Sequence, residues 1–312
     1  MTVPAESSSA AAGSFGHERV AVAQVIAPPR SERVRRAVPA VLSVAIALLM
    51  VALLYGPLIL LAVFSFNNSD ILTLPLRGFT TRWYSDAFAD PRMREGLQNS
   101  IVIATIVTPI CLVLGTLTAY ALTRMRFVMR GGVAMLIGAA LVVPWLVIGI
   151  SALLFFNDNL PLVGRTDLSL RTIGLMHVVC TFPLVAAIVG ARLARFDRTQ
   201  EEAAVDLGAS QLQMLRRVVL PHLVPALVAS AIFAYMWSFN NFEISYFVGG
   251  SDYTFPVWAF STLRHSQNLP VVNAISTVIS GVQVVLVVIA WRVLRPSPGE
   301  PDAGGLIPTV VR

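Results

Sequence analysis

Long apolar runs alternate with short polar connections along almost the whole chain. Six of these runs reach the roughly 20 residues that a helix needs to cross the hydrocarbon core of a bilayer. The runs cover residues 38–66, 100–122, 132–156, 172–194, 220–248 and 271–294. This pattern predicts an all-α polytopic membrane protein with six transmembrane helices over residues 38–295. The Ala-, Ser- and Pro-rich residues 1–37 and the Pro- and Gly-rich residues 296–312 are predicted to be disordered tails.

The third, fourth and fifth runs carry internal prolines, at Pro144, Pro183 and Pro225. A membrane helix tolerates proline where neighbouring helices or water satisfy the carbonyl group that loses its hydrogen bond. We therefore expect three spans that are kinked but continuous.

One connection differs from the others because it is long, polar and patterned. Residues 199–221 read as two short helices that meet at a glycine. Thr199 and Glu202 have the spacing of an N-cap and its reciprocal partner in a capping box. Gly208 can then end the first helix in the left-handed conformation that other residues adopt only at a cost.

The second half of this connection repeats the same signals. Ser210 and Gln213 have the capping-box spacing again, and the helix they start is expected to run to about Val219. Leu220 and Pro221 follow directly and begin the fifth apolar run. The connection is therefore predicted to be a compact helix-turn-helix joined directly to a transmembrane span, as a docking element would be.

Composition supports the membrane assignment and excludes one function. The chain is 56% hydrophobic and only 13% charged, about half the charged fraction of an ordinary soluble protein. Its net charge is +6, and all 23 basic residues are arginine. A phosphate-binding P-loop requires a Gly-Lys-Ser/Thr sequence, so a chain without lysine holds no such ATPase site. Membrane topology explains the arginine excess, and nucleic-acid binding is not indicated.

The arginines also predict the orientation of the chain in the membrane. Connections on one side, together with the segments next to the first and last spans, carry 14 arginines, and the longer loops on the other side carry 7. By the positive-inside rule both termini are predicted to be cytoplasmic. Residues 199–221 are then cytoplasmic as well.

Catalytic and metal-binding patterns are not indicated. Cys111 and Cys180 both lie inside apolar runs, without a CxxC pair or a His/Cys cluster, so buried, inert thiols are expected. His177 and Asn273 lie within spans and are expected to contribute to helix packing. We predict no catalytic residue, no metal ligand and no cofactor bound by this chain.

Aromatic residues gather in the two long loops on the predicted outer side. Two interpretations are open: a belt of aromatic side chains at the level of the lipid headgroups, or a lip on which an external partner sits. In the loop 78–97, Trp83, Tyr84 and Phe88 lie among charges together with the apolar Leu97, as in an interfacial amphipathic helix. The aromatic residues after the fifth run are Tyr253, Phe255, Trp258 and Phe260.

The helix-turn-helix carries a family resemblance. Glu202-Ala203-Ala204, Gly208 and Leu220-Pro221 match the spacing of the EAA motif of ABC importer permeases, with Val218 in place of the motif's isoleucine. The resemblance covers about residues 57–295. More narrowly, the chain resembles the second permease of spermidine/putrescine-type importers. That similarity lies in GFTTRWY (78–84), LGASQLQMLRRVVLPHLVPAL, SFNNFEISYFVGG and YTFPVWAF.

This resemblance implies the type I ABC importer permease fold, in the cytoplasmic (inner) membrane of a bacterium. It also implies a complex with a second permease, making a heterodimer, with two ATPase subunits that bind ATP and Mg²⁺, and with an extracytoplasmic solute-binding protein. The residues that would couple to the ATPases are Glu202, Ala203, Ala204, Asp206, Gly208, Leu220 and Pro221. For Glu202 a purely local capping role remains an alternative.

Polar residues inside the fifth run indicate a path for the solute, because such residues are costly in a membrane and usually face a cavity or the protein interior. A helix would place Trp237, Asn240, Glu243 and Tyr246 on one stripe, with Asn241 beside it. These groups suit a cationic or hydroxylated solute. The alternative is that the amides bridge helices and that Glu243 lies at the outer interface.

The nature of the solute remains open at this point. The resemblance implies a polyamine, but permeases of this branch often have acidic residues where Asn240 and Asn241 stand, so another small organic solute is the alternative. An ion-coupled secondary transporter is an alternative of a different class. It would need midplane carboxylates or inverted repeats, and Glu243 is the only carboxylate within the predicted spans. A membrane-embedded enzyme lacks support because no HExxH or GxSxG sequence occurs.

Overall fold

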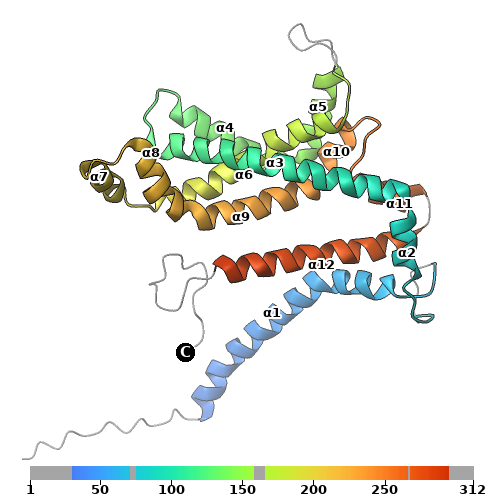
Figure 1. The fold of residues 1–312 in the computed structure, drawn as a ribbon. Helices are drawn as coiled ribbons and strands as arrows, with labels where there is room; N and C mark the ends of the chain where they lie inside the picture. The colour runs from blue at the N-terminus through green and yellow to red at the C-terminus, as the bar shows by residue number, and fades with distance from the viewer. Residues whose placement is uncertain (1–29, 71–74, 158–165, 266–267, 295–312) are drawn as a thin grey trace, which may run out of the picture. The chain divides into compact units, whose positions relative to one another are not determined.

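The computed structural model describes residues 30–70, 75–157, 166–265 and 268–294, and these residues are almost entirely helical (Figure 1). The predicted tails lie mainly outside the described residues. Five described helices are long and apolar enough to cross a membrane, or six if one bent pair counts as a single span. The all-α, six-span prediction is thus confirmed in outline.

The chain divides into two compact units, 1–56 and 57–312, which are described separately. Helix α1 (Arg30–Ser65) begins in the first unit and ends in the second. It starts at Arg30, ahead of residue 38, where the sequence pattern places the first span. Its segment Leu42–Ser65 is apolar around the whole helix, as expected of a helix that is surrounded by lipid or by other membrane helices.

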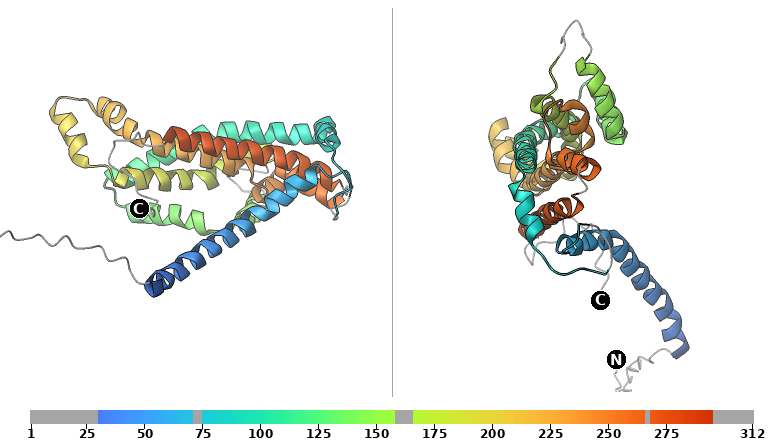
Figure 2. Two further views of the ribbon diagram at one scale, coloured as in Figure 1. Left: turned by 90° about the horizontal axis from the view of Figure 1, so that it is seen from below. Right: turned by 90° about the vertical axis from the view of Figure 1, so that its right-hand side faces the viewer.

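Three long helices form the centre of the second unit. Helices α3 (Pro91–Arg124), α6 (Leu170–Ala194) and α9 (Leu220–Phe239) pack pairwise against one another (Figures 1 and 2). The helices α3 and α6 approach closely because Gly115 has no side chain: a Cβ atom there would lie 2.6 Å from the Cβ of Val185. Pro183 and Pro225 lie within α6 and α9 without interrupting either helix, as predicted.

Shorter helices close the end of the unit at which α3 begins. Helix α2 (Arg82–Ala89) packs on α12 (Leu269–Leu294), and α11 (Phe255–His265) packs on α3. Trp83 and Trp258 are buried here, and the indole N–H of Trp83 donates to the carbonyl of Asn67 at 2.8 Å. Neither interpretation of the outer aromatic residues holds for these two residues, which are part of a hydrophobic core. Phe88 and Phe260 remain exposed.

The third apolar run is not a continuous span, which corrects the sequence prediction. It forms α4 (Arg130–Val142) and α5 (Trp145–Asn157), whose axes differ by 105°. Val143 adopts an extended conformation with ψ of 128°. Proline disfavours the helical conformation of the residue before it, so Pro144 turns the chain instead of kinking it. Helix α5 then packs against the short helix α10 (Glu243–Val248).

The fifth run is also divided, again contrary to expectation. Helix α9 ends at Phe239, residues 240–242 are not helical, and α10 begins at Glu243. Asn240 caps α9 by donating its side-chain amide to the carbonyl of Met236 at 2.9 Å. The side-chain oxygen of Asn241 accepts from the backbone N–H of Ile244 at 3.0 Å. The two adjacent asparagines thus bond backbone groups on both sides of the break, and Asn241 satisfies the N–H that the break leaves free at the start of α10.

The close contact at Gly115 makes a testable prediction. Replacing Gly115 with alanine should lower the free energy of unfolding of the purified protein by about 1–3 kcal/mol, because the new Cβ atom would overlap Val185 and the backbone nitrogen of Ala186. Gly174→Ala is the matched control, since nothing lies within 4 Å of its Cβ position. Thermal unfolding in detergent measures both variants, and equal stability of the two would contradict this packing.

Candidate functional site

The predicted helix-turn-helix is present, and its first helix begins earlier than expected. Helix α7 (Arg198–Asp206) is capped by Asp197, whose carboxylate accepts from the backbone N–H of Thr199 at 3.0 Å. This hydrogen bond lowers the pKa of Asp197. The expected capping box of Thr199 and Glu202 is therefore wrong, because both residues lie inside the helix. Glu202 and Asp206 are exposed on its surface.

Gly208 reverses the chain at the end of α7, as predicted. Its φ angle is +85°, which glycine adopts without a side-chain penalty. The N–H of Gly208 donates to the carbonyl of Val205 at 2.9 Å, and that of Ala209 donates to the carbonyl of Ala204 at 3.0 Å. These two bonds form a Schellman motif. Ala204 thus helps to end the helix and packs against the hydrophobic core.

The second half of the element is fused to the transmembrane core. Ser210 and Gln213 form the predicted capping box at the start of α8 (Gln211–Met214). The helix does not stop at Val219, however. A π-helical turn, η1 (Leu215–Val219), leads without interruption into α9. The wider turn lies next to Pro221, which has no N–H to donate to the preceding turn.

A buried ion pair joins this element to helix α3. Glu201 is only 9% exposed, and one of its carboxylate oxygens accepts from Arg124 Nη2 at 2.6 Å and from Arg124 Nε at 2.7 Å. The same Nη2 donates to the carbonyl of Phe196 at 3.2 Å, and Arg198 Nη2 donates to the carbonyl of Thr123 at 2.8 Å. We call these contacts the α3–α7 clasp. The sequence does not reveal this pair, because Arg124 and Glu201 are 77 residues apart and the adjacent Glu202 has the same side chain.

Both breaks in the membrane helices border one hollow of about 690 Å³. Its lining comes from the break between α4 and α5 and from the break between α9 and α10. The lining residues are Leu141, Trp145, Phe233, Met236, Trp237, Asn240, Asn241 and Glu243. Non-helical backbone at membrane depth is tolerated where it is buried in protein or lines a water-filled cavity. The arrangement of this hollow fits that rule.

Four of the five residues predicted to line a solute path meet at this hollow, and Tyr246 does not. A continuous helix was assumed for the stripe, but the break turns Tyr246 away, and its ring packs on Phe242 and Phe260 instead. Two neighbours were missed. Trp145 meets Trp237 edge to face, with ring centroids 4.8 Å apart. Gln283 of α12 donates to the side-chain oxygen of Asn240 at 3.1 Å.

His177 holds the two halves of the divided run together. Its ring nitrogens lie 2.9 Å from Ser238 Oγ of α9 and 3.2 Å from Ser245 Oγ of α10. Ser245 donates its hydrogen to the carbonyl of Asn241 at 2.8 Å, so His177 Nε2 donates to Ser245. The neutral ring then accepts from Ser238 through Nδ1. The predicted packing role of His177 is confirmed.

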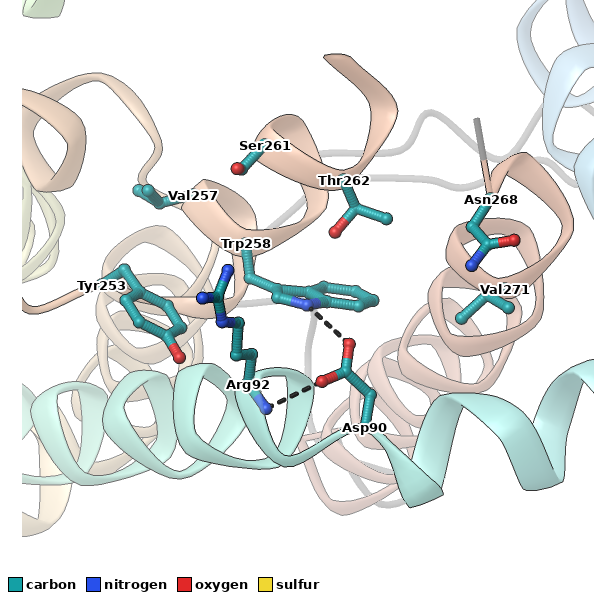
Figure 3. Close-up of a pocket in the computed structure, with 9 residues that line it drawn as sticks. All are labelled: Asp90, Arg92, Tyr253, Val257, Trp258, Ser261, Thr262, Asn268 and Val271. Atoms are coloured by element: carbon teal, nitrogen blue, oxygen red, sulfur yellow. Dashed lines mark hydrogen bonds between the residues drawn. The ribbon is translucent and has the colours of Figure 1, made fainter. Parts of the chain in front are cut away.

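A second crevice, of about 320 Å³, lies between α3, α11 and α12 at the other end of α3 (Figure 3). Asp90 accepts from the backbone N–H of Arg92 at 2.8 Å and from Trp258 Nε1 at 3.2 Å, so both of its oxygens are engaged (Figure 3). Tyr253 donates to Glu95, and burial together with this carboxylate raises the pKa of Tyr253 to about 12. These bonds hold the crevice together, and no predicted path residue lines it.

The described residues contain no group of three or more His, Cys, Asp or Glu side chains that could hold a metal ion. They combine a membrane-spanning helical core, a divided helix beside a polar hollow, and a polar helix-turn-helix fused to that core. These features are those of a multi-pass membrane protein with a polar helix-turn-helix joined to its core.

The chain belongs to the family described as binding-protein-dependent transport system inner membrane component, whose model matches residues 111–296. It is therefore a permease subunit of an ABC importer in the inner membrane, and the ATPase is a separate subunit. This membership confirms the predicted class over the ion-coupled transporter.

Named relatives lie within the same family. The chain is 35% identical over 254 residues to the putrescine transport system permease protein PotI of Escherichia coli (strain K12), covering 80% of this chain and 90% of that protein. It is 32% identical over 245 residues to the spermidine/putrescine transport system permease protein PotC of the same strain, covering 78% and 90%.

Solved structures confirm the expected type I fold. A bacterial ABC transporter involved in alginate import matches with a TM-score of 0.58 at 18% identity, over 86% of this chain and 98% of that one. A bacterial alginate ABC transporter in complex with its pentasaccharide-bound periplasmic protein matches with a TM-score of 0.66 at 14% identity, over 85% and 96%. The MetNI methionine transporter matches with a TM-score of 0.55 at 18% identity, over 65% and 95%.

The bond between Asp90 and Trp258 can be tested with a double-mutant cycle of Asp90→Asn, Trp258→Phe and the double variant. A hydrogen bond to a charged group should give a coupling energy of about 1.5–3 kcal/mol in thermal or denaturant unfolding. A coupling energy near zero would contradict the hydrogen bond between Asp90 and Trp258 in this crevice.

Proposed function

We propose that this chain is one of two permeases of an ATP-driven polyamine importer. One chain offers one helix-turn-helix, whereas two ATPase subunits offer two docking sites, so a second permease completes the assembly. The relatives that transport putrescine and spermidine support the choice of solute. A heterodimer of permeases, two ATPases and an extracytoplasmic solute-binding protein make up the proposed complex.

Residues 199–221 dock on the ATPase and convert its closure into movement of the spans. The observation that carries this proposal is the rigid connection of the element: a Schellman reversal at Gly208 and an unbroken helix from α8 through η1 into α9. Exposed side chains are available for the contact, among them Glu202, Asp206 and Leu207, of which Leu207 is 88% exposed.

The arginine distribution orients the complex. Both termini and the docking element face the cytoplasm, by the positive-inside rule. The helices α2 and α11 lie at the opposite end of the 57–312 unit from α7 and α8 (Figures 1 and 2). That end faces outward and receives the solute-binding protein.

The hollow between the two helix breaks forms this chain's half of the solute path. Asn240 is bonded to Met236 and Gln283, and Asn241 to Ile244. Charge recognition on this side therefore falls to Glu243, aided by the faces of Trp145 and Trp237 through cation–π attraction. One carboxylate suits one ammonium group of a polyamine. Another small organic solute is the alternative, since the neighbouring amides carry no charge.

Uptake of radiolabelled putrescine by cells that express the whole importer tests this solute. Competition by unlabelled spermidine, with no competition by a neutral polyol, is the expected result. Equal competition by the polyol would contradict a polyamine path.

Glu243→Gln should lower putrescine uptake about tenfold or more, because a charge-assisted contact contributes about 1.5–3 kcal/mol. The complex should still assemble, which co-purification with the ATPase checks. Glu95→Gln is the control, since Glu95 lies at the other crevice and glutamine still accepts from Tyr253. Unchanged uptake in Glu243→Gln would show that this carboxylate does not contact the solute.

Gly208 offers a separate test of docking. Asparagine tolerates the left-handed conformation, whereas a β-branched residue is a genuine outlier there. Gly208→Asn should therefore keep ATPase binding, and Gly208→Val should lose it, in co-purification from membranes. Nothing in this chain lies within 4 Å of the Cβ position, so the loss reports backbone strain and contact with the partner. Full ATPase binding and uptake in Gly208→Val would contradict the docking model.

A further inference from the structure

The α3–α7 clasp is the feature of this protein that the docking motif does not explain. Glu201 and Arg124 are 77 residues apart in the sequence and meet at 2.6 Å. Both side chains are nearly inaccessible, with 12% and 9% of their surfaces exposed. Glu201 is thus engaged by Arg124 within the chain, whereas its neighbour Glu202 is exposed.

Burial separates this pair from an ordinary surface ion pair. Arg82 and Asp86 pair at 3.4 Å within one turn of α2, with 60% and 46% of their side chains exposed, and pairs of that kind contribute little. A buried charge that loses its partner is strongly unfavourable. The clasp therefore holds its geometry, and two further hydrogen bonds to the carbonyls of Phe196 and Thr123 reinforce it.

The clasp joins the docking element to a helix that is not its neighbour along the chain. The docking element continues along the chain into α9 through η1, and it follows α6 through residues 195–197. Helix α3 is distant in sequence, and its last turn reaches the element through side chains of the clasp. At 34 residues, α3 is about 50 Å long. Its other end forms the crevice of Asp90 and Trp258 (Figure 3).

We propose that the ion pair of Arg124 and Glu201 transmits displacement of the docking element to α3. The pair connects the last turn of α3 directly to the docking element, in addition to the packing of α3 on α6 and α9. When the ATPases close, the whole core then tilts and the outward-facing end responds. Arg124 and Glu201 are thus positioning residues for energy coupling, without contact with ATP or solute. This inference rests on the proposed docking of residues 199–221.

The test uses the complete importer in proteoliposomes, with ATP hydrolysis and putrescine uptake measured in the same preparation. Glu201→Gln and Arg124→Gln should still assemble with the ATPase and hydrolyse ATP, while uptake per ATP falls by about fivefold or more, within the usual range of coupling between sites. The reversed pair, Arg124→Glu with Glu201→Arg, should recover part of this ratio. Arg126→Gln is the matched control: Arg126 is exposed and lies two residues beyond Arg124, and its replacement should leave the ratio unchanged.

Several outcomes would contradict this proposal. Unchanged uptake per ATP in both single variants would show that α3 needs no such link. A proportional fall in assembly, hydrolysis and uptake would show a merely structural role. If the single variants fail to assemble, the reversed pair decides, because a pair that does not restore both assembly and uptake per ATP contradicts the proposal. The docking proposal itself fails by a different result, namely full ATPase binding and uptake in Gly208→Val.

Discussion

In the hydrocarbon core of a membrane every backbone N–H and C=O group needs a partner within the protein, and this constraint decides where the helices of this chain can break. Two breaks occur in the described residues that the sequence alone would run through, at Pro144 and at residues 240–242. Both border the same hollow. Asn241 satisfies the freed N–H of Ile244, and Asn240 adds a second hydrogen bond to the carbonyl of Met236, so the break is built into the protein.

At the docking element the helices have to stay continuous with the core, in contrast to the breaks beside the hollow. The Schellman motif at Gly208 and the buried pair of Arg124 and Glu201 hold the element against the core, and the helix continues through the π-helical turn into α9. The protein thus combines a stiff connection at one end of α9 with a break at the other. A movement imposed on the element in our proposal therefore reaches the hollow through α9 and reaches the outward-facing end through α3.

Local signals were enough to predict much of this arrangement. Ser210, Gln213 and Gly208 act on backbone groups within a few residues, so spacing alone identified them. The sequence indicated Thr199 instead of Asp197 as the cap, because Thr199 and Glu202 have the spacing of a capping box. Glu201, Trp145 and Gln283 depend on partners far away in sequence, which periodicity cannot supply. The predicted stripe does not reach Tyr246, because α9 ends at Phe239 and a separate helix begins at Glu243. Periodicity assumes one continuous helix there.

The most direct test of the whole account is solute uptake into proteoliposomes that contain both permeases, with the ATPase subunits either present or omitted. The account predicts that uptake requires the ATPases, ATP and the solute-binding protein, and that it persists when an ionophore collapses all ion gradients. Uptake by the permeases alone, driven by a proton or sodium gradient, would contradict it.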